Sequence, residues 1–265
     1  MALGGRTSER AVDGPERRKL HQNDQRYQVR FSRDPVDIAA AQALRHRAFF
    51  GAETMLDQDR FDEICLHVLV EDRQSGAVVC CFRLLALAFG RDIEQSYSAQ
   101  FYDLTALHDF EGGLLEMGRF CIDPAYNDTE IVRAAWVELT RYVDENHIKM
   151  IFGCSSFSGT DPAAYGHAFA TLMRRHLAPA RWRVGIKAAD VVRFATDATA
   201  KPDPHKAKAE MPPLLRSYLQ MGGWVSDHAV IDRAMNTLHV FTGLEISAIP
   251  AARKRILRAM LSSSG

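Results

Sequence analysis

The segment LLEMGRFCIDPAY, residues 114–126, constrains the fold of this chain more than any other stretch. Its apolar, partly alternating pattern predicts a buried strand that ends at the Asp-Pro turn. Glu116 and Arg119 interrupt that pattern, and such charges are expensive to bury unless they are paired or perform a function. A sheet built around this strand must therefore accommodate a carboxylate and a guanidinium.

The spacing of these two charges bears on the shape of the strand. In a regular strand, residues three positions apart point to opposite faces. Glu116 and Arg119 share a face only if a bulge adds one residue between them, and Gly118 favours such a bulge. Arg83 interrupts the apolar run CCFRLLAL in the same way. From these residues alone, a ligand site beside a bulged strand and a structural Glu–Arg–Arg ion network are equally supported.

The order of the predicted elements indicates a mixed α/β fold with a partly antiparallel sheet. A short strand at 27–31 precedes a helix that Asp34 caps and that runs to about residue 50. Segments 65–72 and 77–89 predict an antiparallel hairpin. Asn127, with Glu130 three residues later, predicts a capping box for the next long helix. A proline-rich charged loop is predicted around residues 200–212.

Composition narrows the class of protein. The 265 residues are 47% hydrophobic and 25% charged, which fits one large globular domain or two small ones. Thirty-three basic residues offset thirty-three acidic ones, which argues against a dedicated nucleic-acid binder. The histidines and cysteines show no metal-ligand spacing. No segment has the apolar length of a membrane span or a signal peptide, so we expect a cytoplasmic protein.

The two ends of the chain differ from the middle. Residues 1–26 are polar and without periodicity, which predicts a mobile tail. Residues 251–265 alternate basic and apolar residues at helical spacing, as in a short basic amphipathic helix. That helix fits contact with an anionic membrane surface and packing on its own domain about equally well. Residues 27–250 are expected to form the folded domain.

Three familiar motifs, one for a nucleophile and two for phosphate binding, are absent. The stretch GCSSFSG, residues 153–159, looks like the nucleophile elbow of a serine hydrolase, but Phe157 stands where the motif needs glycine. Neither a GxxxxGK[ST] nor a GxGxxG pattern occurs, so those nucleotide cradles are not supported.

Residues 45–119 resemble the acyl-homoserine-lactone synthase branch of the GNAT-like acyltransferases. The shared pattern is Arg45-x-x-x-Phe49, Asp59-x-x-Asp62, Phe82-Arg83-Leu84-Leu85 and Glu116-x-x-Arg119. A more specific likeness, over roughly residues 44–240, is to bacterial L-ornithine N-acyltransferases, which make the lyso form of ornithine lipid. It includes LRHRAFF, FDEICLH, EMGRFCIDPAY, GCSSFSGTDP, MPPLLRSYLQMGG and VIDRAMNTLHVF.

The resemblance implies a GNAT-like fold: a mixed, mostly antiparallel central sheet with a bulged fourth strand, flanked by helices. It implies transfer of a fatty acyl group, 3-hydroxylated, from acyl carrier protein to the α-amine of L-ornithine. The alternatives are a related N-acyl amino acid or acyl-homoserine-lactone synthase, and a non-catalytic module that binds acyl carrier protein. Product analysis with a panel of amino acids separates these three.

The resemblance also assigns roles to residues. Glu116 is implied as the base that deprotonates the amine, with Arg119 and Arg83 orienting it and receiving the carboxylate of the acceptor. Asp59 and Asp62 suit the acceptor's ammonium groups or the ordering of their own loop. The implied substrate-binding positions are Arg45, Phe49, Asp59, Asp62, Phe82, Ser155 and Ser156. No metal or bound cofactor is implied.

The segment DPAYNDTEIV, which follows the bulged strand, lacks glycine. Acetyl-CoA enzymes of this type present a glycine-rich turn there, whose N–H groups bind the pyrophosphate. The single phosphate of a carrier-bound pantetheine needs less of a cradle. The absence of the turn therefore favours an acyl carrier protein as donor over acyl-CoA.

Overall fold

The computed structural model describes residues 26–51, 55–194 and 202–263. Apart from Arg26, the predicted N-terminal tail lies outside the described residues. Strands are β1 (Tyr27–Ser32), β2 (Leu66–Asp72), β3 (Val78–Leu87), β4 (Tyr102–Asp103), β5 (Gly113–Ile122), β6 (Ile148–Ser158), β7 (Gly185–Ile186), β8 (Val191–Arg193), β9 (Trp224–Val225), β10 (His228–Asp232) and β11 (Thr237–Glu245). Helices are α2 (Pro35–Phe50), α3 (Thr129–Glu145), α4 (Gly166–Arg175), α5 (Pro204–Glu210), α6 (Pro213–Gln220) and α7 (Ala251–Ser263).

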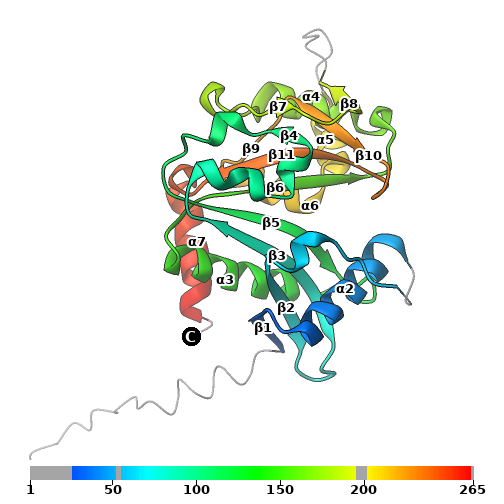
Figure 1. Cartoon of the computed structure of the whole chain (residues 1–265), viewed down its shortest axis with the longest axis vertical. Coiled ribbons are helices and arrows are strands. Elements are labelled where there is room, and N and C mark those ends of the chain that lie inside the picture. The colour runs from blue at the N-terminus through cyan, green and yellow to red at the C-terminus, as the bar shows by residue number, and fades with distance from the viewer. Residues whose placement is uncertain (1–25, 52–54, 195–201, 264–265) are drawn as a thin grey trace, which may run out of the picture.

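A nine-stranded sheet forms the centre of the molecule (Figure 1). Its order is β1-β2-β3-β5-β6-β11-β10-β8, and β9 pairs with β11. All neighbouring strands are antiparallel except β5 and β6, which are parallel. The predicted GNAT-like, mostly antiparallel sheet flanked by helices is confirmed, and β5 is its fourth strand from the N-terminal edge. Strands β4 and β7 form a separate small sheet.

The N-terminal half follows its sequence signals closely. The Asp34 side chain accepts a hydrogen bond from the backbone N–H of Val36, so α2 begins as predicted. It ends at Gly51, whose φ of 74° lies in the left-handed region that glycine adopts without strain. The hairpin of β2 and β3 also forms as predicted.

Helices cover both faces of this half of the sheet. On one face, Ala41 and Leu44 of α2 pack against Leu69, Cys81 and Cys121. On the other face, the larger cluster includes strand residues such as Val68 and Val70 with the apolar side of α3. The alternation along β2 divides its side chains between these two faces.

Two predicted details are wrong by the chemistry of single residues. The N-cap of α3 is Asp128, not Asn127, and its carboxylate accepts from the N–H of Glu130. The Asp128 side chain also accepts from the Tyr27 hydroxyl, which ties the cap to β1. The charged segment predicted as a loop at 200–212 contains α5, because Asp203 caps Pro204 and its neighbours as a short helix.

Short 3₁₀ helices complete the chain between the main elements. They are η1 (Arg60–Asp62), η2 (Gly90–Gln95), η3 (Ser98–Gln100), η4 (Thr105–Leu107), η5 (Pro162–Tyr165), η6 (Ala180–Trp182) and η7 (Ile246–Ala248). The segment from η2 to η4 packs on the sheet through a buried cluster that includes Ile93, Tyr102, Leu107 and Phe241. This insertion between β3 and β5 carries Tyr97, which lines the cleft described below as the candidate site.

Helix α7 lies beside α3 (Figure 1). Leu257 packs against the large core cluster, whereas Ile256 is 47% exposed. One side of the predicted C-terminal amphipathic segment is thus used within the molecule. Over the residues that the structure describes, no helix has the length and apolar character needed to cross a membrane.

Candidate active site

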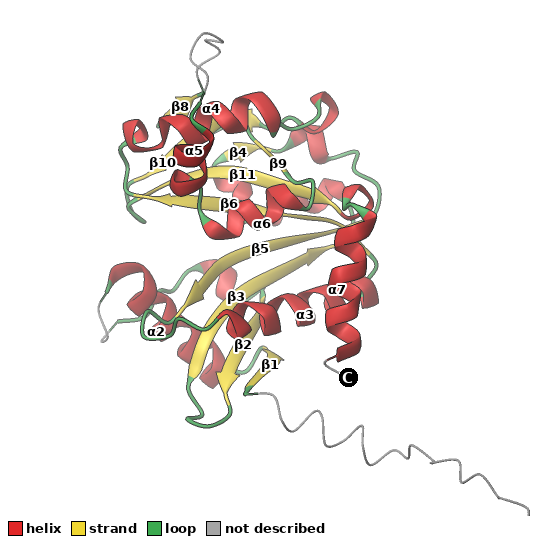
Figure 2. Cartoon of the chain, turned by 180° about the vertical axis from the view of Figure 1, so that it is seen from behind, coloured by secondary structure: helices red, strands yellow, loops and turns green. Residues whose placement is uncertain are grey.

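Strands β5 and β6 lie together at one end and diverge toward the other (Figure 2). Their parallel pairing runs from Gly113 with Ile148 to Glu116 with Phe152 and ends there. Beyond that point β5 stays paired with β3, and β6 stays paired with β11. A Cβ on Gly153 would lie 2.3 Å from the carbonyl oxygen of Met117, so only glycine fits where the strands separate.

The predicted bulge exists one step further along β5 than expected. Cys81 pairs with Cys121 and Arg83 pairs with Gly118, which leaves two residues of β5 opposite one of β3. The extra residue therefore lies after Gly118 and not between Glu116 and Arg119. Arg119 has a φ of 55°, in the left-handed region that non-glycine residues rarely adopt. The bulge redirects the Arg119 side chain.

The separation of the strands opens a cleft of about 650 Å³. Helix α2, the bulged half of β5, the outer half of β6, α6 and the β10–β11 hairpin all contribute to its wall. The residues that line the cleft include Phe49, Arg83, Tyr97, Glu116, Arg119, Phe120, Ser155, Ser156, Asp232 and His239.

Glu116 is 4% exposed and lies in the wall of this cleft. Its Oε2 accepts a hydrogen bond from the N–H of Tyr97 at 2.8 Å. Its Oε1 accepts from the N–H and the hydroxyl of Ser98, at 2.8 and 2.6 Å. All three donors favour the charged carboxylate, and an ionised carboxylate offers about four acceptor positions. The group is thus held in one orientation with acceptor capacity to spare.

Burial raises the pKa of Glu116 above its usual value, because the charged form is poorly solvated there. The hydrogen bonds from Ser98 and Tyr97 act against this rise, as does the charge of Arg83. A carboxylate with a raised pKa is a better proton acceptor than one in water, provided that it stays ionised at working pH. Glu116 therefore has the environment of a general base.

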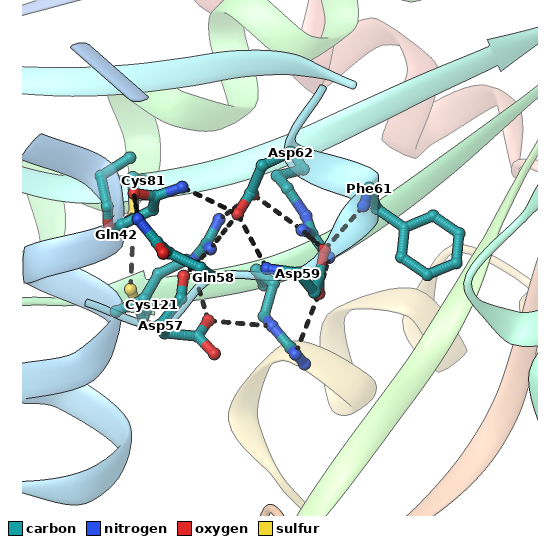
Figure 3. A network of polar contacts seen from close by, with 12 residues as sticks. Gln42, Asp57, Gln58, Asp59, Phe61, Asp62, Cys81 and Cys121 are labelled. Carbon is teal, nitrogen blue, oxygen red and sulfur yellow. Dashed lines mark hydrogen bonds and ion pairs between the residues drawn. The ribbon is translucent and has the colours of Figure 1, made fainter. Parts of the chain in front are cut away.

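Three arginines and three aspartates form a buried cluster beside the cleft (Figure 3). Arg45 is fully buried and binds Asp62 with two hydrogen bonds, of 2.7 and 2.9 Å. Its Nε lies 2.8 Å from a carboxylate oxygen of Asp57. Gln42 donates to Asp62 at 3.0 Å, so this carboxylate has partners on both oxygens.

The other two arginines, Arg83 and Arg119, bind the segment 57–62, which carries the three aspartates and is called the loop from here on. Arg83 donates to Asp59 at 2.5 and 3.0 Å and to Asp62 at 2.8 Å. Arg119 lies 3.1 Å from Asp57 and donates to Asp59 at 3.2 Å. The prediction that Arg83 and Arg119 orient Glu116 is wrong, because backbone and hydroxyl groups hold Glu116 and both arginines hold the loop. They nevertheless line the cleft.

Asp59 and Asp62 are both bound by arginines of the cluster, which lowers their pKa values. Burial acts to raise the pKa of Asp62, but the hydrogen bonds and charges of Arg45 and Arg83 outweigh it and place the pKa well below its usual range. The pKa of Asp59 is lowered in the same way, by Arg83 and Arg119. Neither aspartate is among the residues that line the cleft. Of their two predicted roles, the contacts correspond to ordering of the loop, with Arg45 bracing it from α2.

The remaining predicted residues divide into two groups. Phe49, Ser155 and Ser156 line the cleft, and Ser155 accepts a hydrogen bond from the Thr242 hydroxyl at 2.9 Å. Phe82 does not reach it. Its ring is 2% exposed in the core and packs against Phe120, whose side chain faces the cleft instead. Phe82 therefore supports the cleft wall through Phe120 and does not line it.

Sequence reasoning missed Tyr97 and Ser98, which hold Glu116. They belong to the irregular segment between β3 and β5, where no periodicity marks the residues that turn inward. Their only signal is the run SYSAQ of small and hydroxylated residues ahead of a buried acid. Asp232 and His239 of the β10–β11 hairpin were also missed as cleft residues.

The described residues contain no group of three or more histidine, cysteine, aspartate or glutamate side chains arranged to hold a metal ion. The chemical groups gathered in the cleft include the carboxylates of Glu116 and Asp232, two guanidinium groups, an imidazole, hydroxyls and aromatic rings. This set suits proton transfer and the binding of a carboxylate or thioester substrate.

Comparisons with known proteins agree with this geometry. Residues 42–137 match the family described as Acetyltransferase (GNAT) domain. The L-ornithine N(alpha)-acyltransferase of Rhodobacter capsulatus is 32% identical over 254 residues, covering 90% of this chain and 97% of that protein. The protein of the same name from Brucella abortus is 35% identical over 241 residues, covering 84% of this chain and 85% of that protein.

Proposed function

This chain belongs to the family of L-ornithine N(alpha)-acyltransferases, and on that basis we propose that it transfers a 3-hydroxylated fatty acyl group from acyl carrier protein to the α-amine of L-ornithine. The product is the lyso form of ornithine lipid. The observation that carries the proposal is the Glu116 carboxylate, buried where β5 and β6 separate and facing the cleft.

The reaction needs a base because an amino group is protonated near neutral pH and attacks only when neutral. Glu116 accepts one proton from the α-ammonium group of the acceptor. The amine nitrogen then bonds to the thioester carbonyl carbon, the carbon–sulfur bond breaks, and the pantetheine thiolate leaves. The proton held by Glu116 passes to that thiolate and restores the carboxylate. The second proton, which the nitrogen loses as the amide forms, is released to solvent and completes the proton balance.

The separated strands supply a second requirement of acyl transfer. Attack on the thioester places negative charge on its carbonyl oxygen, and fixed N–H groups stabilise such charge strongly where water is excluded. Beyond Glu116 and Phe152 the facing edges of β5 and β6 no longer pair with each other. Their backbone N–H groups are suitable donors for the oxyanion, with Arg119 beside them.

Two features support an acyl carrier protein as donor. The segment that leads into α3 contains no glycine, so it lacks the usual pyrophosphate cradle of coenzyme A enzymes. Residues 166–220 contain ten basic and four acidic residues in a chain of zero net charge. A cleft of about 1060 Å³ between α4, α5 and α6 has four basic residues in its lining and no acidic ones, and these are Arg174, Arg175, Lys208 and Arg216. That surface complements an acidic carrier.

The test is product analysis with purified enzyme. We expect 3-hydroxyacyl carrier protein and L-ornithine to give N-acyl-ornithine and free carrier thiol in equal amounts, measured by mass spectrometry and thiol titration. Acylation of another amino acid in preference to ornithine would instead identify a related N-acyl amino acid synthase. Carrier binding without any product would identify a non-catalytic binding module.

A further inference from the structure

The far end of the cleft is polar and lies on the same face of the sheet as Glu116. In β11, His239 pairs with Ser156 of β6, and Thr237 pairs with Asp232 of β10. Glu116 pairs with Phe152, four positions before Ser156. Because paired residues share a face and the side-chain period is two, Glu116, Ser156, Asp232 and His239 all project to one side.

The tautomer of His239 follows from where the Tyr102 hydroxyl directs its proton. The Tyr102 hydroxyl donates to the carbonyl oxygen of His239 at 2.8 Å and lies 3.0 Å from its Nδ1. A phenol has one proton, and when that proton is directed to the carbonyl oxygen, Nδ1 donates to the phenol oxygen. The imidazole therefore carries its hydrogen on Nδ1, and Nε2 has a free lone pair.

Nothing in the described part of the chain uses that lone pair. His239 is 2% exposed, and its Nε2 is buried with no hydrogen-bond partner among the described residues. Burial lowers the pKa of His239 to about 4, so the ring is neutral and acts as an acceptor near neutral pH. A buried acceptor without a donor is costly, and His239 lies in the cleft wall.

Asp232 is the second unusual group at this end. It is 9% exposed and accepts from the backbone N–H of Met235 at 3.0 Å. Within the described ranges, none of the ion pairs involves it, in contrast to the three aspartates bound by Arg45, Arg83 and Arg119. It lines the cleft together with His239.

A largely buried carboxylate needs a cation, and a buried imidazole acceptor needs a donor. One ammonium group satisfies both because it carries a positive charge and three N–H donors. We infer that Asp232 and His239 form the subsite for the side-chain ammonium of the acceptor amino acid. This inference rests on the proposed function, in which the α-amine of the same molecule lies at Glu116.

The subsite makes the acceptor a diamine with its two nitrogens at opposite ends of the cleft. Ornithine meets this requirement, whereas norvaline has the same α-amine and carbon chain without the side-chain nitrogen. An amino acid that lacks that nitrogen leaves the Asp232 carboxylate without a partner, and this costs a large part of its binding free energy. Asp232 and His239 therefore determine which amino acid is accepted as substrate, and Glu116 performs the proton transfer.

The experiment compares ornithine with norvaline in Asp232→Asn and His239→Leu proteins, with His239→Gln as the variant that keeps an acceptor. The matched control is Asp190→Asn, which removes a carboxylate from an exposed pair with Arg233 outside the cleft. We expect Asp232→Asn to lower kcat/KM for ornithine roughly 10- to 100-fold. The value for norvaline should rise, because this amino acid no longer leaves a charged carboxylate unpaired. His239→Leu should act in the same direction, and His239→Gln should recover part of the loss.

Calorimetric binding of the two amino acids, without donor, separates this inference from the proposed function. Wild-type protein should bind ornithine more tightly than norvaline, and Asp232→Asn should remove the difference while its melting temperature shows a folded protein. Equal binding of both amino acids by wild type, or an undiminished preference in Asp232→Asn, would overturn the subsite. Preferential ornithine binding without any acyl transfer would retain the subsite and reject the proposed function.

Discussion

The guanidinium of Arg119 packs over the ring of Tyr97, 5.0 Å from its centroid, and its Nη1 lies 3.5 Å from the Tyr97 hydroxyl. The backbone N–H of the same tyrosine donates to Glu116. Tyr97 thus connects the arginine–aspartate cluster to the proposed base, although none of the arginines of this cluster hydrogen-bonds to Glu116 directly. Burial raises the pKa of the Tyr97 hydroxyl to about 12 although the charge of Arg119 acts to lower it, so the group remains a neutral phenol.

We predict that Ser98 is a positioning residue for Glu116. Ser98→Ala removes the 2.6 Å hydroxyl donor and leaves one fewer group stabilising the carboxylate. The pKa of Glu116 should rise further, so the acidic limb of the kcat profile should move to higher pH. Ser98→Thr keeps the hydroxyl and should restore the limb. An unshifted limb in Ser98→Ala would show that this contact does not tune the base.

Arg119→Lys should impair turnover while retaining positive charge. Lysine lacks the planar fork that reaches Asp57 and Asp59 and stacks on Tyr97. We expect a higher KM for the acceptor or a lower kcat, measured at saturating donor. Arg133→Lys on the surface of α3, where the arginine pairs with Glu130 on the same helix, is the matched control. Equal kinetics in both variants would remove Arg119 from the site.

The arginine–aspartate cluster should dominate stability. Asp62→Asn breaks the bidentate contact to fully buried Arg45 and should cost about 3–5 kcal/mol in urea unfolding. Asp37→Asn, in a partly exposed pair with Arg30, should cost less than about 1 kcal/mol. A small loss of unfolding free energy in Asp62→Asn would mean that the cluster positions the loop but does little to stabilise the fold.

The same cluster predicts acid sensitivity. The folded pKa values of Asp59 and Asp62 lie below their unfolded values, so their contribution to stability is complete above about pH 4. It is lost as pH falls through the folded values. Unfolding free energies measured from pH 6 downward should therefore decline in the wild type. The difference between wild type and Asp62→Asn should shrink over the same range, and a constant difference would contradict the assignment.

Docking of the donor should depend on the basic cleft of α4 to α6. The double variant Arg175→Glu with Lys208→Glu should raise the KM for acyl carrier protein and weaken its dependence on salt. The KM for the matching acyl-CoA should stay unchanged, which serves as the internal control. Parallel changes with both donors would place the carrier elsewhere.

The C-terminal helix allows a test of membrane contact. Leu257 packs on the core while Ile256 is exposed, so truncation after Pro250 should lower the melting temperature. Four cations of this segment, each worth on the order of 1 kcal/mol near an anionic leaflet, should also contribute to vesicle binding. The substitution Ile256→Ser, which spares Leu257, separates the two effects. Vesicle binding that survives both changes would assign α7 to packing alone.

The sequence predicted the elements whose signals are local. Asp34 and Gly51 bound α2 through their own side chain and conformation, and the β2–β3 hairpin follows from alternation around a short turn. A bulge was predicted between Glu116 and Arg119. The bulge lies after Gly118, because the pairing of β3 with β5 is regular up to Arg83 and Gly118 and shifts only beyond them. Asn127 and Asp128 are both good caps, and tertiary contacts of Asp128 with Tyr27 and Arg26 distinguish them.

The partners of the buried charges required the structure. Arg83 and Arg119 stand out in the sequence as charges within apolar strands, yet nothing local shows that they bind aspartates 21 to 62 positions earlier. Glu116 meets Tyr97 and Ser98 through an irregular insertion that has no periodic pattern. The tautomer of His239 depends on Tyr102, which lies 137 positions away in sequence.

The most direct test of the account is Glu116→Gln, which keeps the shape of the side chain and removes its basicity. Turnover of 3-hydroxyacyl carrier protein with ornithine should fall roughly 10²- to 10⁴-fold, while donor binding and melting temperature change little. Assays and thermal melts on the same preparation give activity per folded molecule. A Glu116→Gln enzyme that turns over at the wild-type rate per folded molecule would contradict the assignment of Glu116 as the base.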